Sequence, residues 1–168
     1  GTNAPGEIRR LSEIGAPDVA VIVNISKTHL EGLKSIEGVA QAKAEILENL
    51  SKGGVFVYNA DNPWCAKIAS CFKGKTVGFG FSTQAHIRCT DIKKKGKGYV
   101  FELNGHLNVP LPIPGYHNIT NCLASFAICK ALGHDICCVK DAFSSFKLPL
   151  MRIEQQRIGN ITIINDAY

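Results

Sequence analysis

The sequence has no long hydrophobic run. Its apolar stretches fall short of the ~18 consecutive residues that a membrane helix needs, which excludes a membrane-spanning segment. It also shows no internal repeat, no low-complexity segment and no signal peptide. Apolar residues make up 45% of the chain and charged residues 20%, which excludes a disordered or fibrous protein. A chain of 168 residues can form one domain with a buried core.

The cysteines form no CxxC pair. Most of the seven lie inside apolar helical patterns; Cys122 and Cys129 are seven residues apart, on one helix face. Cys137 and Cys138 are adjacent and point in different directions. We therefore predict structural thiols in a reducing cytoplasm, not disulfides or a metal site.

A net charge of +5 is partly concentrated in one lysine cluster, Lys93, Lys94, Lys95 and Lys97. Glycines interrupt the cluster and apolar residues alternate on either side, a pattern typical of a solvated hairpin turn. This interpretation is favoured over a nucleic-acid patch, so no nucleic-acid partner is predicted, although phosphate-bearing small ligands remain compatible with the charge.

The first half of the chain alternates strands and helices. A short amphipathic helix is predicted between Gly6 and Gly15, where Ile8, Leu11 and Ile14 recur at helical spacing. Continuous apolar strands are predicted at 19–25, 55–58 and 76–81, and helices at 36–50 and 63–72. Continuous apolar strands are buried on both faces, and such alternation indicates right-handed crossovers. The predicted fold class is α/β, a mainly parallel sheet flanked by helices.

The second half changes pattern. Short segments at 87–92, 99–103 and 106–111 are separated by glycine-containing turns and predict a small antiparallel β insert. Helices are expected at 117–132 and 136–146, and a final pair of strands at 151–157 and 161–164. We predict a domain boundary at Pro149, with 1–149 in one domain and 150–168 opening the next.

A polar segment from Asn24 to Gly32 follows the first strand. Open α/β sheets bind ligands at the carboxyl ends of their strands. His29 in this segment could coordinate a metal or contact phosphate; alternatively it forms a local hydrogen bond within the loop. Glu31 could do no more than cap the neighbouring turn.

Lys43 lies in a helix among small residues, which would let another group approach the backbone. The alternative is a solvent-facing lysine, for which the nearest acids are Glu45 and Glu48.

Two asparagines, Asn118 and Asn121, begin an apolar helix whose free amides could bind an anion or a base. Both could face one ligand, or Asn118 could be the N-cap. Arg152 and Asp166 complete the candidates. Each alone is a weak signal, because a surface ion pair or a strand-edge charge is the usual fate of such residues.

The order of these segments resembles the Mur ligase family, most closely its branch that adds D-alanyl-D-alanine. The matching stretches are Gly6-Glu7-Ile8, Asn24-Ile25 with His29-Leu30-Glu31-Gly32, Ala42-Lys43-Ala44-Glu45-Ile46, Asn59-Ala60-Asp61-Asn62-Pro63, Gly115 to Asn121, and Arg152-Ile153-Glu154. The resemblance implies an ATP-dependent bacterial, cytoplasmic ligase of peptidoglycan synthesis that forms an acyl phosphate. Its implied substrates are UDP-N-acetylmuramoyl-tripeptide and D-alanyl-D-alanine.

The resemblance also implies roles for single residues. His29 and a carbamylated Lys43 would bind Mg²⁺, with two ions in the intact enzyme. Asn118, Asn121, Arg152 and Asp166 would lie near ATP. Asn62 stands where the family has an acid, and Lys27-Thr28 replaces small residues.

The family's GxxGKT phosphate loop is absent, since Gly74-Lys75-Thr76 lies between a helix and a strand, the reverse of a P-loop. The chain opens on Gly1 and stops at Tyr168 after an apolar strand, so we expect a fragment that is inactive alone. The alternatives are another Mur ligase, a folylpolyglutamate synthetase-like ligase, or a non-catalytic nucleotide-binding module.

Overall fold

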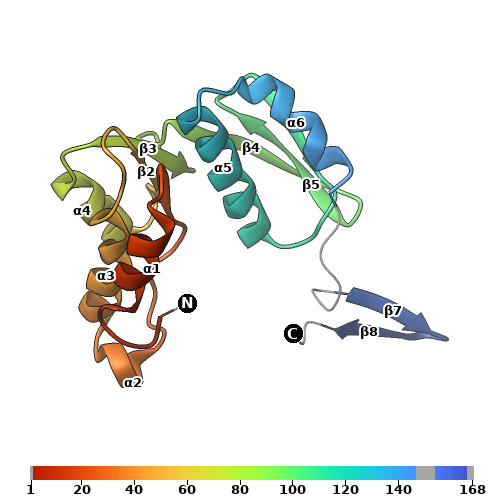
Figure 1. The fold of residues 1–168 in the computed structure, drawn as a ribbon. Coiled ribbons are helices and arrows are strands. Elements are labelled where there is room, and N and C mark those ends of the chain that lie inside the picture. The colour runs from red at the N-terminus through yellow and green to blue at the C-terminus, as the bar shows by residue number, and fades with distance from the viewer. Residues whose placement is uncertain (1, 147–153, 166–168) are drawn as a thin grey trace.

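The computed structural model describes residues 2–146 and 154–165. Strands β1 to β6 form one mixed sheet in sequential order, and β7 and β8 form a separate two-stranded sheet. The predicted α/β class is confirmed (Figure 1). The strands are β1 (Val19–Ile22), β2 (Val55–Asn59), β3 (Lys75–Gly80), β4 (Ile87–Lys95), β5 (Gly98–Leu103), β6 (Leu107–Leu111), β7 (Glu154–Ile158) and β8 (Ile161–Asn165).

The first three strands are parallel. Val19 pairs with Val55, and Val55 in turn pairs with Lys75. The carboxyl ends of β1, β2 and β3 therefore lie at one edge of the sheet, where crossover connections place the loops that bind ligands in open α/β sheets.

The strands β4, β5 and β6 are antiparallel, as predicted for the insert. A short parallel pairing of Phe79 with Ile87 joins β3 to β4, so the insert extends the main sheet instead of standing apart from it. Gly96, with a φ of 59°, makes the turn between β4 and β5. The neighbouring lysines are exposed there, which confirms the solvated hairpin.

Helices α5 (Tyr116–Ala131) and α6 (Ile136–Ser144) cover one face of the sheet (Figure 1). The buried side of α5 includes Ile119, Leu123 and Phe126, which pack with residues of β2 to β6 in the larger core cluster. Cys122 belongs to that cluster as well, as its spacing predicted.

Helices α3 (Ile36–Ala44) and α4 (Pro63–Cys71) cover the opposite face, around the buried ring of Phe56. The helix predicted at 36–50 is shorter, because α3 passes at Glu45 into the 3₁₀ turn η1 (Glu45–Leu47). A short helix α2 (Leu30–Leu33) lies inside the polar stretch 26–35, for which the sequence predicts only a loop.

Helix α1 (Glu7–Gly15) forms where the apolar spacing predicts it, but its apolar side is not covered by the described residues. Leu11 is 57% exposed and Ile14 70%, whereas the buried residue of α1 is Ser12. The periodicity therefore determined the helix without determining its burial. Within the described residues, no helix is long and apolar enough to cross a membrane.

Candidate functional site

The loops after β1 and β2 are joined by side-chain amides. Asn59 Nδ2 donates to the carbonyl of Val23 at 3.1 Å. Asn62 Nδ2 donates to Asn24 Oδ1 at 2.8 Å and to the carbonyl of Ile25 at 2.9 Å. These bonds fix the polar segment after β1 at the carboxyl edge of the sheet.

The loop after β3 is tied to the same edge by Asp61. Its carboxylate accepts from the backbone amides of Phe81 at 2.7 Å and Ser82 at 2.9 Å. Gly80 precedes them with a φ of 156°, and a Cβ there would lie 2.4 Å from the Asp61 carboxylate. Only glycine lets the strand end this close to the acid.

Lys43 reaches this edge from α3. Its Nζ donates to the carbonyl of Asn24 at 2.7 Å, and the residue is half-buried. Lys43 therefore remains partly exposed to solvent, but its ammonium group is held by a backbone carbonyl at this edge. Glu45 and Glu48, the acids nearest in sequence, contact Arg9 instead, and Lys43 forms no ion pair with any described residue.

The thiol of Cys65 is close enough to Lys43 to be influenced by its charge. The thiol is fully buried, and burial raises its pKa to about 11. The positive charge of Lys43 acts in the opposite direction on that pKa. The thiol is therefore held protonated at neutral pH, which confirms a structural cysteine.

His29 is exposed at the start of α2, where its backbone adopts a left-handed φ of 54°. Its carbonyl accepts from Leu33 at 3.0 Å, but its ring makes no hydrogen bond to a described residue. The local hydrogen-bonding alternative is therefore not what holds the ring. His29 and Lys43 are linked through one segment, since Lys43 binds Asn24 five residues upstream of the histidine.

Asn118 is the third residue of α5 and not its N-cap, so that alternative is wrong. Gly115 occupies the N-cap with a φ of 94°. Asn118 is buried, and its Nδ2 donates back to the carbonyl of Pro114 at 2.7 Å. Asn121, one turn later, is exposed. The two side chains thus differ in access to a ligand.

The other candidates add little at this edge. Glu31 is exposed in the first turn of α2. Arg152 and Asp166 lie outside the described residues, so their roles stay predictions. The described part of the chain contains no group of three His, Cys, Asp or Glu side chains that could hold a metal.

Sequence reasoning missed the asparagine network of Asn24, Asn59 and Asn62 as the framework of the site. The signal was present, since each residue lies at or shortly after the carboxyl end of a strand. The sequence alone does not show the pairing, because each asparagine bonds a residue 36 to 38 positions away.

The parallel strands β1 to β3, with polar loops at their carboxyl ends, form the kind of edge at which open α/β sheets bind ligands. Residues 1–129 match the model of the Mur ligase middle domain, and the chain belongs to this family.

Among its relatives, the UDP-N-acetylmuramoyl-tripeptide–D-alanyl-D-alanine ligases of Buchnera aphidicola and Bacillus subtilis are 36% and 35% identical over the whole chain. The chain spans 38% and 36% of their lengths. The crystal structure of MurF from Acinetobacter baumannii superposes with a TM-score of 0.91 at 27% identity, with 100% of this chain and 38% of that one covered.

Proposed function

We propose that this chain is part of an ATP-dependent ligase that adds D-alanyl-D-alanine to UDP-N-acetylmuramoyl-tripeptide. Relatives that carry this name match 100% of the chain. A UDP-N-acetylmuramate–L-alanine ligase from Sulfurihydrogenibium is 30% identical and matches 89%. The higher identity and fuller coverage favour the D-alanyl-D-alanine branch over this neighbour.

In the proposed reaction a substrate carboxylate oxygen attacks the γ-phosphorus of ATP, and ADP leaves. The amine of the dipeptide then attacks the acyl carbon, and phosphate leaves as the amide bond forms. Both steps build up negative charge on phosphoryl oxygens, so positioned cations are the main requirement.

The observation that carries the proposal is the environment of Lys43. Its Nζ is held at 2.7 Å from the Asn24 carbonyl, at the edge where this fold binds ligands, and it has no carboxylate partner among the described residues. A neutral lysine amine can add CO₂ and release a proton. The resulting carbamate would carry negative charge and oxygen donors into the site.

The residues fit Mg²⁺ only after this modification. Magnesium prefers hard oxygen ligands, which a carbamate supplies and an ammonium group does not. His29 offers an exposed ring nitrogen, a softer ligand, so Lys43 carries more of the argument. Bound magnesium would neutralise phosphate charge. The remaining ligands would come from phosphates or from residues outside those described.

On the nucleotide side we propose that Asn121, which is exposed, contacts ATP, and that Asn118 shapes the preceding loop through Pro114. From the family resemblance we also propose Arg152 near the phosphates and Asp166 near the ribose or the hinge. The chain has no GxxGKT loop, so we expect no ATP turnover by the 168 residues alone.

The test is a comparison of Lys43→Ala with Lys52→Ala in the intact protein that contains this chain. Lys52 is exposed in the turn that precedes β2, at the opposite end of that strand from the site, so it controls for loss of a positive charge. We expect phosphate release that requires both substrates, a fall on the order of 10²-fold or more for Lys43→Ala, and little change for Lys52→Ala. If the intact protein without substitutions released no substrate-dependent phosphate, it would be a nucleotide-binding module and not a ligase.

A further inference from the structure

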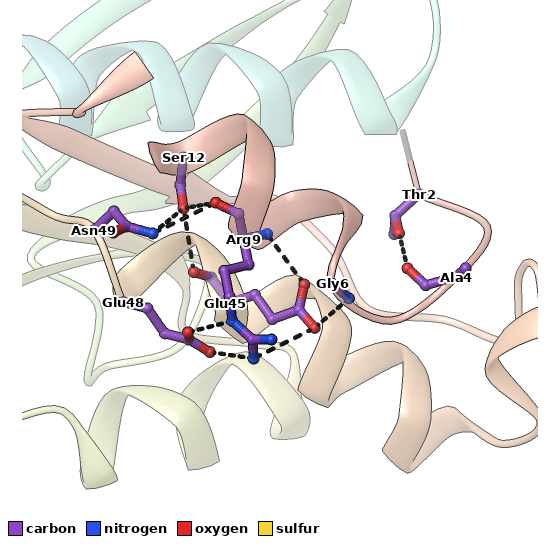
Figure 2. Close-up of polar contacts among 8 residues, drawn as sticks. All are labelled: Thr2, Ala4, Gly6, Arg9, Ser12, Glu45, Glu48 and Asn49. Atoms are coloured by element: carbon purple, nitrogen blue, oxygen red, sulfur yellow. Dashed lines mark hydrogen bonds and ion pairs between the residues drawn. The ribbon is translucent and has the colours of Figure 1, made fainter. Parts of the chain in front are cut away.

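Residues 2–9 are anchored to the end of α3 by the carboxylate of Glu45 (Figure 2). Glu45 is 7% exposed. Its Oε1 accepts from the Gly6 amide at 2.8 Å and its Oε2 from the Arg9 amide at 3.1 Å. Helix α1 has no side-chain N-cap of its own. Glu45, 39 residues further along, satisfies these free amides at the positive end of the helix.

The anchored segment is itself closed by Glu7. One oxygen of that carboxylate accepts from the Thr2 hydroxyl at 3.1 Å and from the amides of Asn3 at 2.7 Å and Ala4 at 3.2 Å. Residues 2–9 therefore form one hydrogen-bonded unit that Glu45 holds as a whole.

The same unit touches the turn that follows His29. A Cβ on Gly32 would lie 1.7 Å from the carbonyl oxygen of Asn3, so the two backbones are in direct contact. The turn is short and bounded by left-handed residues, His29 at its start and Lys34 at its end. A displacement of Asn3 would therefore move Gly32 and, with it, the short helix α2, whose N-cap residue is His29.

We propose that Glu45 is a positioning residue that fixes His29 relative to Lys43. Lys43 and Glu45 are two residues apart on one helical segment, so their side chains leave from different faces of it. Lys43 reaches Asn24, and Glu45 holds the unit that presses on Gly32. Glu45 thus sets the distance between the two proposed metal-binding side chains without contacting a ligand. This role rests on the proposed function.

Hydrogen exchange of the full 168-residue chain tests the positioning without any activity. Glu45→Ala is compared with Glu48→Ala, an exposed acid on the same segment that bonds Arg9 but not the backbone of α1. We expect Glu45→Ala to speed exchange at least tenfold at the amides of Arg9, Leu33 and Lys34, with β2 unchanged. Glu48→Ala should leave Leu33 and Lys34 unaffected. Faster exchange in α1 alone would overturn the inference.

If Glu45→Ala also speeds exchange in β2, the variant has lost stability throughout, and Gly32→Ala becomes the test. The new Cβ would push Asn3 away from α2 directly. Its control is Gly15→Ala, where a Cβ would meet nothing within 4 Å. Faster exchange at Leu33 and Lys34 in Gly32→Ala but not in Gly15→Ala supports the coupling, and equal exchange in both variants overturns it.

A second readout uses the intact ligase and magnesium itself. We expect Glu45→Ala to raise the Mg²⁺ concentration that gives the half-maximal rate at least tenfold. Glu45→Gln should have an intermediate Mg²⁺ midpoint, because Gln keeps one acceptor oxygen. A merely structural Glu45 would lower thermal stability and leave the magnesium midpoint unchanged, which would overturn the inference. Absence of ligase activity in the unmodified protein would instead refute the proposed function, and hydrogen exchange would still decide the positioning.

Discussion

Asp61→Asn offers a direct test of how the strand ends are held together. The native carboxylate accepts from two amides on the next loop, Phe81 at 2.7 Å and Ser82 at 2.9 Å. The substitution keeps the size of the side chain but leaves only one acceptor oxygen. One of the two amides then faces an NH₂ group, and the remaining bond loses its charge assistance.

The size of the effect follows from this geometry. A hydrogen bond to a charged group contributes about 1.5–3 kcal/mol, and the low end applies here because Asp61 is exposed. We therefore expect the free energy of unfolding to fall by about 1.5 kcal/mol. For a chain of this size that corresponds to a Tm lower by roughly 3–6 °C.

The assay is thermal and urea unfolding followed by the fluorescence of Trp64, the one tryptophan of the chain, three residues after Asp61. Asp141→Asn on α6 is the matched control, because Asp141 is exposed and makes no hydrogen bond or ion pair to a described residue. If Asp61→Asn and Asp141→Asn unfolded within about 0.3 kcal/mol of each other, smaller than a typical single hydrogen bond, the proposed joining of the strand ends would be refuted.

Two further outcomes are expected. Backbone hydrogen bonds from Asn3 and Ala4 lower the pKa of Glu7 from its ordinary 4.5, so its stabilisation is present above that pH and is lost as the pH falls below it. Between about pH 5 and pH 3 the native chain should therefore lose more stability than Glu7→Gln in acid titration; parallel curves would contradict this. Burial raises the pKa of Cys65 and of Cys89 to about 11 and raises that of Cys122 further. A thiol reagent at pH 8 should therefore label these three cysteines only after unfolding. The exposed cysteines, Cys71, Cys137 and Cys138, should react in the native chain. Mass spectrometry would identify the labelled residues, and labelling of a buried cysteine in the native chain would contradict the prediction.

Much of the architecture was predictable, because secondary structure depends on local patterns. Apolar runs and helical spacings identified β1, β2, β3 and the main helices to within a few residues, apart from the early end of α3 and the short α2. The antiparallel strands followed from glycine-punctuated alternation. Burial was harder to predict than secondary structure. Nothing in the spacing of Leu11 and Ile14 indicated that they stay exposed in the described part of the chain.

The sequence by itself determined the α/β class. It also predicted the edge of the sheet where a ligand would bind and, through the resemblance to Mur ligases, the candidates Lys43 and His29. Only the tertiary structure decided what these side chains contact. Lys43 meets a carbonyl 19 residues away, and Glu45 caps a helix 39 residues away. Such partners are set by sheet register and by the way helices pack on the sheet. No local pattern encodes them, because a polar side chain can pair with any group that folding brings within hydrogen-bond reach.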